Sequence, residues 1–179
     1  MEGPNVRKIV FGASESAVPS LPAQGSDITW ATPWLTVLGG QPGDSDDAYL
    51  DEDSIDVTPI EESLTDDPPL AQNKLGEVMF KNGIESVGFS CYSVKQAVFD
   101  LSGTSVATSN VTEEGVTITF VAMCIEYTGV GLLYFPKVRV KVSGIPSAIK
   151  DHSKVELEAM VFGTTTVPSG YQWHEFDGS

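Results

Sequence analysis

The chain has 179 residues and a mass of 19.1 kDa, enough for one domain with a substantial core. Its 25 Asp and Glu residues against 10 Lys and Arg residues give a formal charge of −15, which disfavours tight wrapping of a nucleic-acid backbone. No apolar run approaches the roughly 18 residues of a membrane-spanning helix, and none follows Arg7 and Lys8 as in a signal peptide, so we expect neither a membrane span nor secretion.

Residues 1–40 predict an irregular arm with one short strand. Four prolines forbid a continuous helix here: Pro4, Pro19, Pro22 and Pro33. Trp30 and Trp34 belong to an apolar cluster ahead of Gly39 that requires burial, in this subunit or against a neighbour.

Residues 41–74 predict a long acidic loop. No basic residue lies between Lys8 and Lys74, and the 13 acids of this interval include 11 in residues 44–67. The remainder of the chain, with 12 acids and 10 bases, carries a charge of only −2. Solvation of a loop is one reading of the acidic run, and ordering by contact with a partner is another.

Calcium binding is a rival reading of the carboxylates between Asp44 and Asp56. An EF-hand loop needs Gly at its sixth position and Glu at its twelfth. Counted from Asp44, those positions hold Tyr49 and Ile55, so we expect no calcium site of this type.

Residues 75–165 predict a β-sandwich core that begins with a hairpin. Val78 and Phe80 alternate with polar residues, Asn82-Gly83 is typical of a type I′ turn, and the return strand continues to Cys91. A short helix over residues 93–102 follows.

The helix prediction rests on capping and on spacing. Ser93 and Gln96 form a capping box, and Gly103 stands where a C-cap glycine belongs. The apolar stripe at i, i+3, i+4 and i+7 consists of Val94, Ala97, Val98 and Leu101.

Three further strands are predicted by their apolar patterns. Val116–Tyr127 is apolar on both faces from Phe120 onward, as in a central strand that is covered on both sides. In Leu132–Val142, valines on one face alternate with Lys137, Arg139 and Lys141 on the other.

Pro136 cannot donate to a ladder, so that part of the second strand belongs at an edge or a bulge. Val155–Phe162 alternates with Glu156 and Glu158, which places two acids where they can pair with a basic strand face.

Residues 166–179 form a polar tail with three aromatic residues, Tyr171, Trp173 and Phe176. Such side chains are costly to leave in water. They either fold back on their own sheet or dock on another subunit.

The residues for common catalytic and metal chemistry are sparse. Cys91 and Cys124 lie in apolar surroundings without metal-ligand spacing, which predicts buried reduced thiols. His152 and His174, the two histidines, lie in polar surroundings, and no nucleophile, metalloprotease or phosphate-loop motif occurs. We expect no enzyme and no cofactor, although paired carboxylates stay open because a sequence contains no distances.

The second half of the chain resembles the major tail tube proteins of long-tailed (siphovirus-type) bacteriophages. The likeness lies in the succession of elements along the chain. A strand and a short amphipathic helix over residues 87–101 are followed by the strand Val116–Tyr127, the segment Leu133–Val140 and the strand Val155–Phe162. The segment Trp34–Gly39 ahead of an acidic excursion is also similar.

The resemblance implies a mainly β fold, a two-sheet β-sandwich or barrel with one flanking helix, a long acidic loop and extended termini over the single domain 1–179. It implies a structural virion protein whose six subunits join their inner sheets into a ring, with rings stacked into a hollow tube. Tape-measure, tail-terminator and tail-tip proteins would be its partners. DNA would pass through the lumen without specific binding, and assembly would take place in the host cytoplasm.

Under this reading, charged and aromatic residues become candidate subunit contacts. They are Asp44, Asp46, Asp47, Asp51, Glu52, Asp53, Lys137, Arg139, Lys141, Glu156, Glu158, Tyr171, Trp173 and Phe176. The basic residues could pair with the two glutamates of their own subunit or with the acidic loop of a neighbour. Two alternatives stay open: another virion β-protein, such as a capsid decoration or tail-completion protein, and a monomeric β-sandwich binding module.

Overall fold

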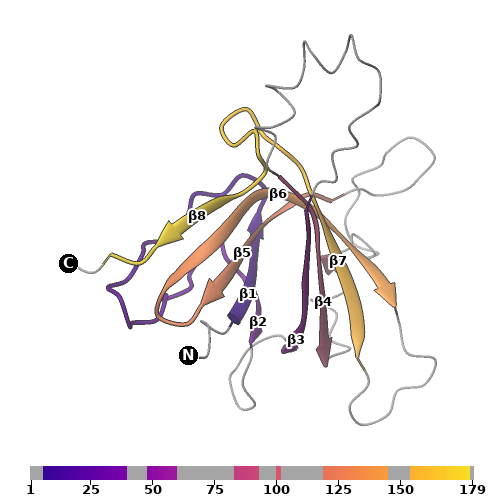
Figure 1. Cartoon of the computed structure of the whole chain (residues 1–179), viewed down its shortest axis with the longest axis horizontal. Helices are drawn as coiled ribbons and strands as arrows, with labels where there is room; N and C mark the ends of the chain where they lie inside the picture. The colour runs from indigo at the N-terminus through magenta and orange to yellow at the C-terminus, as the bar shows by residue number, and fades with distance from the viewer. Residues whose placement is uncertain are drawn as a thin grey trace, which may run out of the picture.

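A computed structural model describes residues 6–39, 48–59, 83–92, 100–101, 119–144 and 154–177, with the side chains of Arg7 and Glu52 excepted (Figure 1). These residues form a mainly β fold, which confirms the predicted class. Several predictions lie outside the described residues: those for Asp44, Asp46 and Asp47, for the strand at 78–81, for His152 and for most of the helix at 93–102.

Eight strands occur in the described residues. They are β1 (Val6–Ala13), β2 (Thr36–Gly39), β3 (Ala48–Pro59), β4 (Ile84–Tyr92), β5 (Val121–Tyr127), β6 (Gly131–Gly144), β7 (Val155–Val161) and β8 (Gln172–Glu175). Their order is β5-β1-β2-β3-β4-β7-β6-β8, and a further β5–β6 pairing closes the first seven strands into a barrel. Every pair is antiparallel except the parallel pair β2–β3.

Of the predicted two-sheet β-sandwich or barrel, the structure has the barrel, one sheet closed on itself, because the 14-residue strand β6 pairs with β5 in its first half and with β7 in its second. Its first half pairs with β5 on one side and β8 on the other, and its second half pairs with β7. Figure 1 shows β8 along the first part of β6 and β7 along the last part.

A bulge at Pro136 lets β6 change partners. Val121 of β5 lies opposite Val138, whereas Met123 lies opposite Phe135, so β6 carries one extra residue between these pairs. The backbone N–H of Glu15 donates to the Pro136 carbonyl at 2.7 Å. The predicted edge or bulge at Pro136 is therefore confirmed as a bulge.

The barrel interior is filled by alternate residues of all seven strands. The fully buried members with the largest side chains are Phe11, Phe135, Ile9, Leu38, Met123, Ile125, Leu157 and Val87. On β6, Val138 and Val140 are buried and Val142 packs against them, as the alternation predicted. β7 buries Val155, Leu157 and Ala159 in the same way.

A second apolar cluster covers the outer face of β1, β5 and β6. Ala122 and Cys124 of β5 pack there against Ile28, Trp34 and Phe176. Both faces of β5 are therefore buried, as its apolar composition predicted. Trp34 of the predicted apolar cluster is buried in its own chain and Trp30 is half-buried against it, whereas Leu35 is 71% exposed.

Two segments predicted as irregular form strands. β1 lies in the predicted arm and β3 in the predicted acidic loop. In β1 the period-two pattern is hidden because both faces are buried, with Ile9 and Phe11 facing the interior and Val10 facing Trp34. β3 forms because Ala48 and Leu50 are buried in the barrel, despite the acids around them.

The predicted return strand of the hairpin is confirmed as β4, whereas its predicted partner at 78–81 lies outside the described residues. Both edges of β4 are occupied, by β3 and by β7. Of the predicted helix, only Asp100 and Leu101 are described, with Leu101 buried in the core, so the helix is not confirmed. Within the described residues, no helix is long and apolar enough to cross a membrane.

Candidate interaction surface

Four neighbouring strands carry the features that bear on function. They are β3, β4, β7 and the second half of β6 (residues 138–144), hereafter the edge sheet, in which every neighbouring pair is antiparallel. β3 pairs with β2 only through Ala48 and Tyr49, and no described strand flanks residues 50–59 on that side. β6 pairs with β5 only as far as Val138, and no described strand flanks residues 139–144 there.

Residues that lie directly opposite one another on the four strands form rows across the edge sheet. Each row has one end at the β3 edge and the other at the β6 edge. The strand registers define three such rows: Asp51, Ser90, Glu156, Gly144; Asp56, Gly88, Glu158, Lys141; and Thr58, Ser86, Met160, Arg139. These rows alternate with buried rows such as Val87, Ala159 and Val140. The three rows therefore lie on the outer face.

The two edges carry opposite charge. On the β3 side the acids Asp51, Asp53 and Asp56 are half-buried or exposed. On the β6 side the bases Lys137, Arg139 and Lys141 follow one another at period two. The structure thus places Asp51 of the predicted acidic set, together with Asp56, at one margin of this face, and Arg139 and Lys141 of the basic set at the other.

The predicted pairing between β6 and β7 forms at one position. Lys141 Nζ lies 2.8 Å from Glu158 Oε2, and this hydrogen bond lowers the pKa of the Glu158 carboxyl below its usual value. Arg139 lies opposite Met160 rather than an acid. Glu156 lies opposite Gly144, and its carboxylate takes the space that a β-carbon at Gly144 would fill.

A second ion pair holds the β3 margin. Lys154, just before β7, pairs with the Asp51 carboxylate, and its Nζ lies 5.2 Å from the centre of the Tyr92 ring. The hydrogen bond to Asp51 raises the pKa of Lys154. Among the described residues Asp56, one row further along the same margin, has no ion-pair partner.

A wide bulge separates Asp51 from Asp56. Four residues of β3 stand opposite the single residue Phe89 of β4. Ser54 closes the bulge, because its hydroxyl donates to the Asp51 carbonyl at 2.6 Å and accepts from the Ser90 N–H at 2.7 Å. The bulge presents Asp53 to solvent.

Exposed apolar side chains accompany both margins. Phe120, Met160 and Phe162 lie beside the basic residues, with the Phe120 and Phe162 rings 5.4 Å apart and Lys137 Nζ 4.5 Å above Phe120. Val57 is 37% exposed on β3. Apolar groups beside paired charges are typical of a protein contact.

The aromatic tail folds back on its own sheet. Tyr171 packs against Phe135, with ring centres 6.4 Å apart, and Phe176 is buried. Of the two readings left open for the tail, these two residues follow the first, because they pack on their own sheet. Trp173 packs against Tyr127 but stays 48% exposed.

Glu126 is a structural residue that the sequence reasoning missed. It is 1% exposed, and its two carboxylate oxygens accept from the Ile28 N–H at 3.2 Å and from Trp30 Nε1 at 2.9 Å. The sequence signal that could have identified it is a single acid within the otherwise apolar strand β5. Glu126 fixes the segment between β1 and β2 against the outer face of β5.

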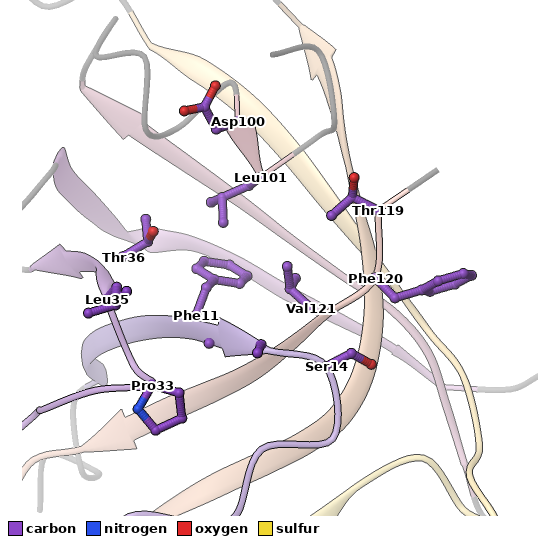
Figure 2. A pocket seen from close by; sticks show the side chains of 12 residues that line it. Phe11, Ser14, Pro33, Leu35, Thr36, Asp100, Leu101, Thr119, Phe120 and Val121 are labelled. Carbon is purple, nitrogen blue, oxygen red and sulfur yellow. The ribbon is translucent and has the colours of Figure 1, made fainter. Parts of the chain in front are cut away.

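A cavity of about 420 Å³ opens at the mouth of the barrel (Figure 2). Phe11 and Leu101 point toward one another across it, with Asp100 and Thr119 at its rim. The Phe120 ring points away from the cavity.

The described residues hold no group of three or more side chains suited to a metal ion. Both cysteines are free and buried, as predicted, and burial raises the pKa of Cys91 to about 11 and that of Cys124 further. His174 packs on Tyr134, with ring centres 6.1 Å apart. Comparisons of the sequence with protein-family models and with curated proteins find no match.

Proposed function

We propose that this protein is a structural virion subunit that assembles into stacked hexameric rings, the hollow tail tube through which phage DNA reaches the host. The observation that carries the proposal is the edge sheet, whose two margins have no strand partner among the described residues and lie at the ends of the same rows. Such edges are a liability in a monomer and are useful when copies pair edge to edge.

The strand directions support a ring rather than a simple pair. Because the edge sheet has four antiparallel strands, β3 and β6 run in opposite directions. A second copy rotated about an axis along the strands can then place its β3 beside β6 as a further antiparallel neighbour. The contact is head-to-tail, so repetition closes a ring when the rotation per copy divides a full turn.

The charges support the same arrangement. An edge with Asp51 and Asp56 would meet an edge with Arg139 and Lys141, whereas two like edges would repel one another. A chain with a net charge of −15 would also offer DNA little attraction, so a duplex could slide through a bore without binding.

In this role the protein needs no cofactor and performs no chemistry. Its partners would be copies of itself and the tape-measure, tail-terminator and tail-tip proteins. It would assemble in the host cytoplasm and end in the virion tail.

Negative-stain electron microscopy of the purified chain, over a series of protein and salt concentrations, tests the proposal. We expect six-fold rings or hollow tubes, with sedimentation velocity giving the mass of the assembled species. A monomer at every condition would contradict the proposal.

The cavity at the barrel mouth favours a second candidate, a monomeric binding module for a small apolar molecule. Its volume of about 420 Å³ lies in the range of ligand sites, and barrel mouths are common positions for them. Saturable binding of an apolar fluorescent probe by a strictly monomeric chain, lost in a Leu101→Asp variant that keeps its circular dichroism, would favour this candidate.

A further inference from the structure

We infer that the two margins of the edge sheet are guarded by ion pairs within the free chain, and that association with a second copy exchanges the partner of Lys141. In the free chain Lys141 is held by Glu158. In the assembled chain it takes Asp56 of the next copy. The inference rests on the proposed self-assembly and adds to it the contact that is made and the contact that is released.

The geometry of the β6 margin permits this exchange. Lys141 and Glu158 lie side by side on β6 and β7, and Lys141 is the outermost residue of its row. Their side chains are 51% and 34% exposed, so the pair is solvated and weak enough to be replaced. A lysine at the margin can therefore turn from a carboxylate on its own sheet to one beyond the edge.

The β3 margin offers the complementary group at the other end of the same row. Asp56 lies in the row of Gly88, Glu158 and Lys141, is exposed, and has no ion-pair partner among the described residues. Asp51, in the neighbouring row, is occupied by Lys154. Within the part of the chain that the structure describes, Asp56 is therefore the one of these two acids that no internal ion pair occupies.

Charge and strand direction identify the occupant as a second copy. The bases of β6 are concentrated on a chain that carries −15 in total, so an approaching copy presents an acidic edge of the required sign. An antiparallel β3 also continues the ladder of the edge sheet. Exposed apolar residues at both margins, Phe162 and Val57 among them, add area to the same contact.

The internal ion pairs have a consequence for the free chain. Each margin is partly neutralised by a residue of its own sheet, Glu158 for Lys141 and Lys154 for Asp51. Lys141 has to give up Glu158 before it can bind Asp56 of the next copy, and this competition weakens the contact between copies. Removing the internal partner of Lys141 should therefore strengthen association.

A charge exchange tests which residues meet. Asp56→Lys alone and Lys141→Glu alone should each weaken self-association at least about tenfold in sedimentation velocity, because each puts like charges together. An equimolar mixture of the two variants should regain association, since every contact then joins opposite charges. Circular dichroism checks that both variants are folded.

A second variant tests the exchange itself. Glu158→Gln releases Lys141 and should lower the concentration of half-association by about two- to fivefold, the range of one exposed ion pair. Glu156→Gln is the matched control, because it removes the same charge from the same strand and face without touching the Lys141 pair. Weaker association of Glu158→Gln, or the same change in both variants, would overturn the exchange.

The outcomes separate this inference from the proposed function. Rings of the unaltered chain without rescue by the mixture would overturn the Asp56–Lys141 contact and leave the tube proposal standing. Rescue to dimers or short chains without closed rings would support the contact and contradict the tube. If neither the unaltered chain nor the mixture associates, both are overturned.

Discussion

Glu126 illustrates how a single buried polar residue can organise a fold. Its carboxylate satisfies a backbone N–H and an indole N–H of a segment about 100 positions earlier in the chain. Trp30 then packs edge-on against Trp34, and Trp34 packs edge-on against Tyr134. One acid thus connects the outer face of the barrel to the aromatic cluster that covers it.

Replacing Glu126 with Gln should destabilise the fold. The amide keeps one acceptor but turns an NH₂ group toward a donor, which should lower the free energy of unfolding by about 1.5–3 kcal/mol. Urea unfolding followed by tryptophan fluorescence measures this. Glu175→Gln, on the exposed strand β8, is the control and should change little. Equal stability of the two variants would show that the Glu126 contacts contribute nothing.

The buried thiols predict a pH dependence at the residue scale. Burial raises the pKa of Cys91 from 9.0 to about 11 and raises that of Cys124 as well. At pH 8 the folded chain should therefore react far more slowly with a thiol reagent than the chain in urea, which is measured by absorbance. Because the raised pKa favours the protonated thiol, its contribution to stability is complete below pH 9 and declines as the pH rises toward 11. Rapid reaction of the folded chain would contradict this.

At the scale of elements, Phe176 is the fully buried one of the two residues that anchor β8, and Tyr171 is half-buried. Its four residues are exposed or half-buried, whereas Phe176 directly after it is 2% exposed in the outer cluster. The Phe176 N–H also donates to the Val130 carbonyl at 2.9 Å. A strand this short depends on that anchor for its place beside β6.

Phe176→Ala should destabilise the chain by about 3–5 kcal/mol and expose the β8 amides to hydrogen exchange. Trp173→Ala, half exposed and in the same strand, should cost less than about 2 kcal/mol and leave the other β8 amides protected. Chemical denaturation and exchange mass spectrometry give the two readouts. If the two substitutions cost the same, the proposed anchor is wrong.

The β6–β7 ion pair predicts an acid-dependent contribution. The hydrogen bond from Lys141 lowers the pKa of Glu158 below 4.5, so the stabilisation is complete above that pH and is lost as the pH falls through the lowered value. The difference in free energy of unfolding between the unaltered chain and Glu158→Gln should shrink from pH 7 to pH 3. Urea titrations at each pH measure it. A difference that grows on acidification would contradict the assignment.

At the scale of the whole molecule, two electrostatic effects oppose one another. In the proposed assembly a net charge of −15 would keep copies apart, whereas the opposite charges on the two margins would draw them together. Screening acts on them unequally, because the Debye length of about 10 Å at 0.1 M salt is long compared with an ion pair.

Association should therefore respond to salt in two phases. It should strengthen as about 0.1–0.2 M salt screens the net repulsion, and weaken toward 1 M, where screening reaches the contact itself at about 3 Å. Sedimentation velocity over a NaCl series measures both phases. The Asp56→Lys variant should lack the weakening toward 1 M salt. If association of the unaltered chain declined steadily from the lowest salt concentration, the proposed balance of repulsion and contact would be contradicted.

Strands with one buried face were predictable from the sequence. β7 and the second half of β6 expose every second residue, so their alternation of apolar and charged side chains reports the local structure directly. β1 and β3 were not predictable in this way. β1 is covered on both faces, and β3 places acids on a solvent face beside only two buried residues, Ala48 and Leu50.

The sequence by itself determined the mainly β class, the charged and apolar faces of β6 and β7, an edge or a bulge at Pro136, and the burial of the two cysteines. Each of these follows from the periodicity or the chemistry of neighbouring residues. The tertiary structure alone decided the closure of one barrel, the role of Glu126 and the alignment of Asp56 with Lys141. These depend on register between strands far apart in the chain, which pairing and packing set together and which no local pattern records.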